Sequence, residues 1–213
     1  MNNTVHLIDC MEYMKTVPDK FFELAIVDPP YGINVNMNMG KRKKEVKKYK
    51  NKKWDTSPLE SYFKELFRIS VNQIIWGIDY FKNISGKGRI KWDKDISGSV
   101  PFSKYEMAYQ SYNEEEGYIK IRIQNTMPFT RIHPCQKPVA LYKWLLQKYA
   151  KPGDKIFDSH VGSGSSRIAC YDMGFDFMGC ELDPDYWQAQ EDRYQTHIKQ
   201  GCLFEFTGGT IIS

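Results

Sequence analysis

The sequence predicts a single α/β domain with a mostly parallel, doubly wound sheet, and three observations lead to that prediction. The 213 residues are enough for one such domain with a sizeable core and too few for two ordinary ones. Short apolar runs alternate with amphipathic helical patterns, which is typical of parallel sheets covered by helices on both faces. A Gly-x-Gly turn at 162–164 follows one of the predicted strands, where open α/β sheets bind ligands.

The N-terminal half contains apolar runs of strand length and one clear helical pattern. The runs predict strands over residues 24–27, 71–76, 89–92 and 105–109. The first of these stops at Asp28, which begins an Asp-Pro-Pro turn. Ser57 and Pro58 are typical of a helix start, and the apolar pattern behind them extends to Ile69.

The C-terminal third is more regular. Strands are predicted at 155–158 and 175–180, and helices at 138–150, 165–173 and 184–200. Pro138 suits the first turn of a helix, Gly153 and Gly174 suit helix ends, and Asp183 suits a helix N-cap.

Composition excludes several classes of protein. No stretch approaches about 18 consecutive apolar residues, so we expect no transmembrane helix. The N-terminus lacks a basic region followed by an apolar core, so we expect a cytoplasmic protein without a secretory signal. The five cysteines form no C-x-x-C pair, and the four histidines show no metal-ligand spacing. We therefore expect neither a disulfide framework nor a metal site.

Positive charge is concentrated in one segment. Residues 41–53 hold nine Lys or Arg and one Glu, so that the rest of the chain carries a net charge of −4 against a total of +4. Such a run is either a solvated, disordered face or an arm that binds nucleic-acid phosphates. The residues expected to contact phosphates are Lys41, Arg42, Lys43, Lys44, Lys47 and Lys48.

A cofactor site is predicted at the glycine turn. The order strand, Gly-x-Gly, helix, strand and Glu181 is typical of sites for nucleoside-containing cofactors, in which the acid accepts hydrogen bonds from ribose hydroxyls. The third glycine of the dinucleotide pattern is replaced by Arg167. Asp158 at the strand end would repel a pyrophosphate but could pair with an amino group. This favours S-adenosylmethionine over NAD.

A second candidate site is the tetrapeptide Asp28-Pro29-Pro30-Tyr31 at the end of its strand. Consecutive prolines fix the backbone and remove N–H donors, so their carbonyls and the Asp28 carboxylate form a rim of acceptors suited to an amino group. Tyr31 supplies a face for stacking. The alternative is a Pro-Pro turn with a capping aspartate.

Three blocks of the chain resemble the DNA amino-methyltransferases that modify adenine N6 or cytosine N4, in the permuted (beta) group that places the target motif ahead of the cofactor motif. The blocks are residues 7–32, 131–138 (RIHPCQKP) and 158–166 (DSHVGSGSS). The chain departs from the family at His160, where an aromatic or aliphatic residue is usual. Only residues 111–130 stand where larger relatives have a target-recognition domain, so the chain resembles a short form of the family.

The resemblance implies one Rossmann-like methyltransferase domain over 1–213, dependent on S-adenosylmethionine, with a basic DNA-binding loop at 33–57. It implies that Asp28, Pro29, Pro30 and Tyr31 hold the target base. The residues implied to surround the cofactor are Asp9, Cys10, Lys137, Asp158, His160, Gly162, Ser163, Gly164, Ser165 and Glu181.

The implied substrate is DNA, and adenine N6 is favoured because Asp28 precedes Pro-Pro-Tyr, whereas serine is commoner there in cytosine-N4 enzymes. Cytosine N4 and RNA adenine N6 remain alternatives, as does a nucleic-acid-binding protein without activity. Cys135 within Pro-Cys-Gln resembles the nucleophile of cytosine-C5 enzymes, but it lies upstream of the cofactor motif rather than downstream. We interpret it as a filler residue. The chain length also suits an orphan or dimeric enzyme.

Overall fold

The computed structural model describes residues 2–33, 56–82, 84, 86, 88–98, 103–112, 115–122, 132–133 and 135–206, with side chains up to residue 200. Its strands are β1 (Asn3–Leu7), β2 (Phe22–Val27), β3 (Ser70–Trp76), β4 (Arg89–Asp93), β5 (Tyr105–Gln110), β6 (Glu116–Lys120), β7 (Lys155–Asp158) and β8 (Asp176–Glu181). Its helices are α1 (Cys10–Thr16), α2 (Glu60–Ile69), α3 (Val139–Tyr149), α4 (Ser165–Met173), α5 (Pro184–Phe206) and a 3₁₀ turn, η1 (Ile78–Tyr80).

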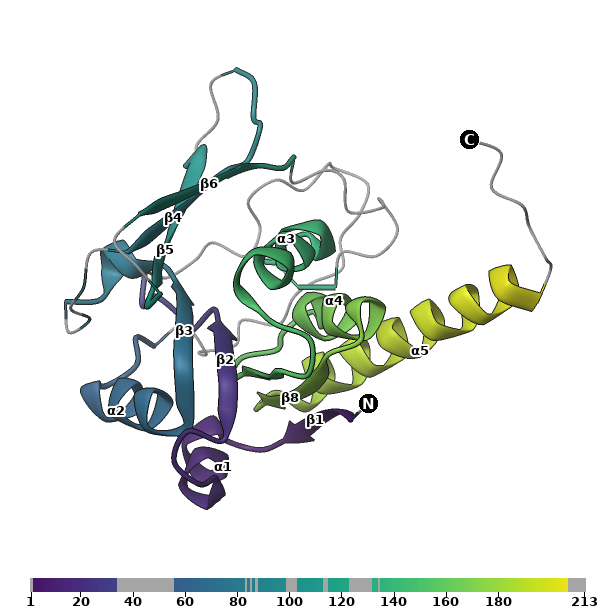
Figure 1. Ribbon diagram of the computed structural model, residues 1–213, viewed down its shortest axis with the longest axis horizontal. Helices are drawn as coiled ribbons and strands as arrows, with labels where there is room; N and C mark the ends of the chain where they lie inside the picture. The colour runs from purple at the N-terminus through teal and green to yellow at the C-terminus, as the bar shows by residue number, and fades with distance from the viewer. Residues whose placement is uncertain are drawn as a thin grey trace.

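The described strands form one sheet in the order β1-β8-β7-β2-β3-β5-β4-β6. Neighbouring strands are parallel except at β5, which runs antiparallel to both β3 and β4 (Figure 1). The predicted α/β fold with a mostly parallel sheet is therefore confirmed. Parallel neighbours need a crossover connection, and the chain supplies it through α2 between β2 and β3 and through α4 between β7 and β8.

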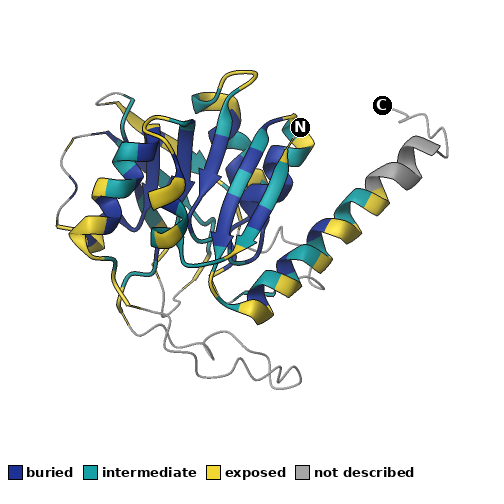
Figure 2. Cartoon of the chain, turned by 90° about the horizontal axis from the view of Figure 1, so that it is seen from below, coloured by how far each residue is buried: buried dark blue, intermediate teal, exposed yellow. Residues whose placement is uncertain are grey.

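Helices cover both faces of the central sheet. Leu24 and Ile26 of β2 pack on the face that holds α3 and α4, whereas Ala25 and Val27 pack on the face that holds α1 and α2. Figure 2 shows the strands buried between these layers, with exposed residues on the outer sides of the helices. Burial on both sides explains why β2 appears in the sequence as an uninterrupted apolar run.

Most predicted elements are present, and two helix ends follow the predicted signals. Pro138 is the N-cap of α3, and Gly174 ends α4 in the left-handed conformation with φ +77°. The sequence interpretation missed β1 and β6, because each has only one fully buried residue, Val5 and Gly117, and so lacks a clear apolar pattern. Strand β6 lies within 111–130 and extends the sheet beside β4.

The parallel strands β1, β8, β7 and β2 all end at one edge of the sheet, as in other open α/β sheets that bind ligands there. Glu181 and Asp158 are the last residues of β8 and β7, and Asp28 directly follows β2. The fold thus brings the two predicted sites together. In the described part of the chain, no helix is both long enough and apolar enough to cross a membrane.

Candidate active site

Asp158 lies at the centre of the predicted cofactor turn and is almost fully buried. Its carboxylate accepts hydrogen bonds from the backbone N–H of His160 at 3.0 Å and from the Ser166 hydroxyl at 2.6 Å. Burial raises the pKa of Asp158 to about 7, although these two donors oppose the shift. A cation bound beside Asp158 would favour its ionised form.

Glu181, on the neighbouring strand, is fixed by backbone donors. Its Oε2 accepts from the N–H of Gly162 and its Oε1 from the N–H of Asp183, both at 2.9 Å. Burial raises the pKa of Glu181. A carboxylate offers about four acceptor positions, so this one can still accept hydrogen bonds from a diol.

The turn between these acids requires glycine. Gly162 and Gly164 have φ of +52° and +74°, a region that side chains rarely adopt. The serines between and after them are buried and contact α5: Arg193 donates to the Ser163 carbonyl at 2.6 Å and to the Ser165 hydroxyl at 3.0 Å. Their predicted role in cofactor binding stays a prediction.

A pocket of about 170 Å³ opens beside the turn and is lined by Cys10, His160, Pro30 and Tyr62 among others. It therefore joins residues predicted for the cofactor to one predicted for the target base. Burial lowers the pKa of His160 to about 4 and raises that of Cys10 to about 12, so both are neutral at pH 7. Asp9, next to the pocket, caps α1 by accepting from the N–H of Met11 at 2.7 Å.

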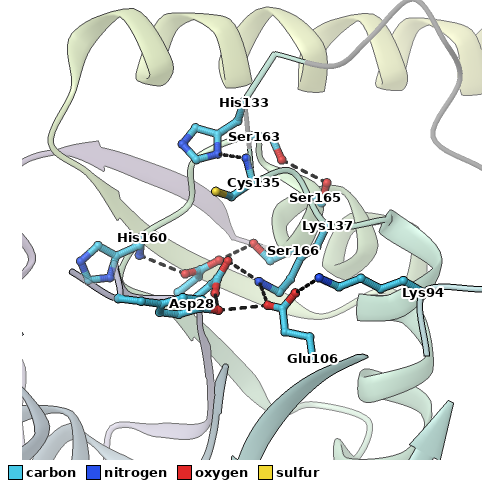
Figure 3. A network of polar contacts seen from close by, with 12 residues as sticks. Asp28, Lys94, Glu106, His133, Cys135, Lys137, His160, Ser163, Ser165 and Ser166 are labelled. Atoms are coloured by element: carbon cyan, nitrogen blue, oxygen red, sulfur yellow. Dashed lines mark hydrogen bonds and ion pairs between the residues drawn. The ribbon is translucent and has the colours of Figure 1, made fainter. Parts of the chain in front are cut away.

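Asp28 lies in a cluster of charged side chains. Lys137 Nζ lies 2.5 Å from Asp28 Oδ2 and 2.7 Å from Glu106 Oε1, and Lys94 Nζ lies 3.0 Å from Glu106 Oε2. Figure 3 shows Lys137 between the two carboxylates and Lys94 on the far side of Glu106. Lys137 is only 5% exposed, so this ammonium has little contact with water.

The charges in this cluster are divided unequally. Burial raises the pKa of Asp28 despite the attraction of Lys137. Burial also acts to raise the pKa of Glu106, but Lys137 and Lys94 outweigh it and lower that pKa to about 2. Burial alone would lower the pKa of Lys137, yet the two acids raise it. Glu106 is thus firmly ionised, and Asp28 is the more basic of the two carboxylates.

Tyr31 completes the cluster through its hydroxyl, which lies 2.5 Å from Asp28 Oδ1 and 3.0 Å from Glu106 Oε1. Its ring stacks on Tyr80 with centroids 4.9 Å apart and lies so close to Gly77 that no room is left for a Cβ there. Tyr31 is therefore held from both ends. Stacking on a target base remains a prediction for this residue.

The segment around 132–138 contacts both predicted sites. The ring of His133 lies 3.7 Å from where a Cβ on Gly162 would be, and Lys137 reaches Asp28. The structure thus places Lys137 against the target motif, while its predicted contact with the cofactor stays untested. Cys135 is exposed and its backbone N–H donates to His133 Nδ1 at 3.2 Å.

Three charged residues at or near the site were missed by the sequence interpretation. Glu106 and Lys94 were not noticed because single charges in short strands and loops are common. Arg167 was noted only as a missing glycine, yet it is buried and donates to Asn3 and Glu191, which ties α4 to β1 and α5. A lone acid in the apolar strand 105–110 was the available signal for Glu106.

The groups around the glycine turn fit a cofactor that carries both a ribose and an amino group. The carboxylates of Asp158 and Glu181 lie at the ends of neighbouring strands. Asp158 is suited to an ammonium and Glu181 to a diol. A pyrophosphate at the glycine turn would lie close to the buried Asp158 carboxylate and would be repelled by its ionised form, so the turn suits a dinucleotide less well.

Solved structures with a similar fold include a complex with SAM and an enzyme named as a DNA methyltransferase. The chain superposes on M1.HpyAVI in complex with SAM with a TM-score of 0.61 at 19% sequence identity, covering 89% of this chain and 98% of that one. It superposes on the cytosine-N4-specific PvuII DNA methyltransferase with a TM-score of 0.64 at 13% identity, covering 91% and 86%. The chain therefore shares the Rossmann-like α/β fold of these structures.

Sequence comparison shows the family to which the chain belongs. The model for N6/N4 methyltransferases, described as DNA methylase, matches residues 34–192. YubD of Escherichia coli (strain K12), which is named as a methylase on a provisional basis, is 24% identical over 216 residues, covering 91% of this chain and 92% of its own. The chain belongs to the N6/N4 DNA methylase family. Asp28 and Tyr31 lie just before the matched range, which contains Glu106 and Lys137.

Proposed function

We propose that this DNA methylase transfers a methyl group from S-adenosylmethionine to the N6 amino group of an adenine that is flipped out of the helix. The observation that carries the proposal is the position of Asp28: a half-buried carboxylate of raised pKa, directly after β2 and next to the strand that ends in Asp158. This places an acceptor for an amine beside a site that fits the cofactor.

Asp158 and Glu181 hold the cofactor in this proposal. Asp158 pairs with its amino group, and Glu181, fixed by two backbone donors, accepts hydrogen bonds from its ribose hydroxyls. When bound, S-adenosylmethionine supplies a methyl group on a sulfonium that an amine can attack directly. No covalent enzyme intermediate is needed.

Asp28 acts on the nucleophile. The lone pair of an aromatic amine is delocalised into its ring, which makes the amine a poor nucleophile. Hydrogen bonds to Asp28 favour a tetrahedral nitrogen and stabilise the positive charge that develops on it. Because burial raises the pKa of Asp28, it is a stronger acceptor than an exposed aspartate.

Adenine is favoured over cytosine by the first residue of the motif, which is Asp28 rather than serine. Removing the base from the duplex costs a few kcal/mol of stacking, part of which contacts within the pocket can recover. The basic residues 41–48 follow the target motif in the chain, where they can neutralise the phosphates beside a flipped base.

Sequencing of modified bases in DNA from cells that express the protein tests this function. We expect N6-methyladenine at a defined short sequence with the wild-type protein and none with Asp28→Ala. N4-methylcytosine instead would overturn the adenine assignment. Modification of RNA but not of DNA would overturn the proposed substrate.

A further inference from the structure

The charged cluster contains a second carboxylate, Glu106, to which the mechanism above gives no task. Glu106 is 17% exposed and is held between two ammonium groups, Lys137 at 2.7 Å and Lys94 at 3.0 Å. Burying such a group is costly, and buried ion pairs are weak contributors to stability when compared with apolar residues of the same size. Its position beside Asp28 points to a role in the reaction instead.

The number of donors around Asp28 explains that role. Both Asp28 oxygens already accept a hydrogen bond, one from Tyr31 and one from Lys137. An ammonium has three N–H donors and can serve two carboxylates at once, whereas a phenol has only one. The single hydroxyl proton of Tyr31 can therefore form a full hydrogen bond to only one carboxylate at a time. The Tyr31 oxygen lies 2.5 Å from Asp28 Oδ1 and 3.0 Å from Glu106 Oε1.

An incoming amine needs acceptor positions on Asp28. If Glu106 accepts the hydrogen bond from the Tyr31 hydroxyl and shares Lys137, then Asp28 keeps acceptor positions open for the amine. It also keeps its electron density. If Glu106 is neutral, both donors concentrate on Asp28 and compete with the amine. We propose that Glu106 is a positioning residue for methyl transfer, which draws Tyr31 and Lys137 partly away from Asp28 so that Asp28 can accept the target amine.

Lys94 supports this arrangement from outside. Together with Lys137 it keeps Glu106 ionised, with a pKa of about 2, so that Glu106 remains an acceptor throughout the neutral range. In the described part of the chain, the Asp28 charge also raises the pKa of Asp158, Tyr62 and Tyr142. None of these three has a hydrogen bond to Asp28 among the contacts of the described residues. The inference rests on the proposed function, because it assigns Asp28 the target amine.

The first test measures single-turnover methyl transfer to unmethylated plasmid DNA at saturating tritiated S-adenosylmethionine. We expect Glu106→Gln to lower the rate about tenfold or more, as removal of groups around a reacting centre typically does. Calorimetry should show a cofactor Kd within about threefold of wild type, since Glu106 lies on the target side. Glu116→Gln, at an exposed position on β6, is the matched control and should leave the rate unchanged.

Lys94→Met separates the role of Glu106 from that of the whole network. It removes the outer partner of Glu106 but leaves Tyr31 and Lys137 shared, so it should lower the rate clearly less than Glu106→Gln does. A loss equal to that of Glu106→Gln would overturn the proposal, because the whole network would then matter only as a structural unit. If Glu106→Gln does not fold, Glu106→Asp replaces it: a rate at least about threefold below wild type is expected, and an unchanged rate would overturn the proposal.

A second readout does not depend on activity. Carbon-13 NMR titration of the Asp28 carboxyl should give a lower pKa in Glu106→Gln than in the wild type, because a like charge is lost and Lys137 pairs with Asp28 alone. An unchanged pKa would contradict the proposed sharing. A wild-type protein that methylates no DNA would refute the proposed function, while this titration would still decide whether Glu106 controls Asp28.

Discussion

The two halves of the site are held in different ways. On the side proposed to bind the cofactor, backbone N–H groups and a serine hydroxyl fix Asp158 and Glu181, and the contacting residues are close in sequence, such as Asp158 and Ser166 eight positions apart. On the side proposed to hold the target base, charged side chains from distant segments meet at Asp28. Lys137 is 109 positions away from Asp28, and Glu106 is 75 away from Tyr31.

This difference separates two kinds of function. A turn held by its own backbone keeps its shape when one side chain changes, so substitutions there should alter affinity for the cofactor. A cluster in which donors are shared responds to every charge within it, so substitutions there should alter the reactivity of the amine. Rate and affinity are therefore expected to respond to different residues.

The largest effect is expected for Asp28→Ala, which removes the proposed acceptor for the amine. We predict a loss in kcat of about 100-fold or more, as is typical when a group that stabilises developing charge is removed. The measurement is tritium transfer to DNA at saturating cofactor. Retention of more than about a tenth of the wild-type kcat would show that Asp28 does not have this role.

Glu181→Gln tests the half of the site that is proposed to bind the cofactor. It keeps the size of the side chain but loses the proposed charge-assisted hydrogen bonds to ribose, so affinity for S-adenosylmethionine should fall by about 1–3 kcal/mol. The rate at saturating cofactor should change little. Calorimetry that gives an unchanged affinity, or that shows preferential binding of NAD, would refute the cofactor assignment.

The basic run at 41–53 lies outside the described residues and is predicted to act on DNA alone. Changing Lys43, Lys44, Lys47 and Lys48 to Gln should weaken DNA binding, and each lost phosphate contact should lower the slope of log affinity against log salt by about 0.9 on duplex DNA. Cofactor affinity should stay constant. Superimposable salt slopes for wild type and variant would indicate a solvated face without contact to DNA.

A smaller effect concerns pH. The pKa of Asp158 is raised to about 7, so its carboxylate becomes protonated as pH falls and can then no longer attract the cofactor's amino group. Affinity for S-adenosylmethionine should therefore fall about eightfold between pH 7.5 and 6. Asp158→Asn should bind more weakly at pH 7.5 and lose most of this dependence. Equal wild-type affinity at the two pH values would contradict the pairing.

No effect is expected for Cys135→Ser. Cys135 is exposed, whereas the target cluster is built on Asp28 and contains no thiol among the described residues. The variant should transfer methyl groups at the wild-type rate in the same tritium assay. A folded but inactive variant would revive covalent attack on a cytosine ring.

The same comparison explains what the sequence can predict. The predicted cofactor turn is local: a strand, two glycines, a helix and a following acid stand in fixed order, so Asp158, Gly162 and Glu181 could be proposed as one site from the sequence, and the structure does bring them together. The sheet followed from runs such as 24–27 that are apolar on both faces. Glu106 and Lys94 could not be assigned to Asp28, because the antiparallel insertion of β5 between β3 and β4 determines which strand ends meet.

The central claim, that Asp28 acts on the amine and not on the cofactor, is tested most directly by the affinity of Asp28→Ala for S-adenosylmethionine. Calorimetry on the protein that has lost methyl transfer should give a Kd within a few-fold of wild type. A loss of affinity as large as that of Glu181→Gln would contradict the account, because Asp28 would then belong to the cofactor site.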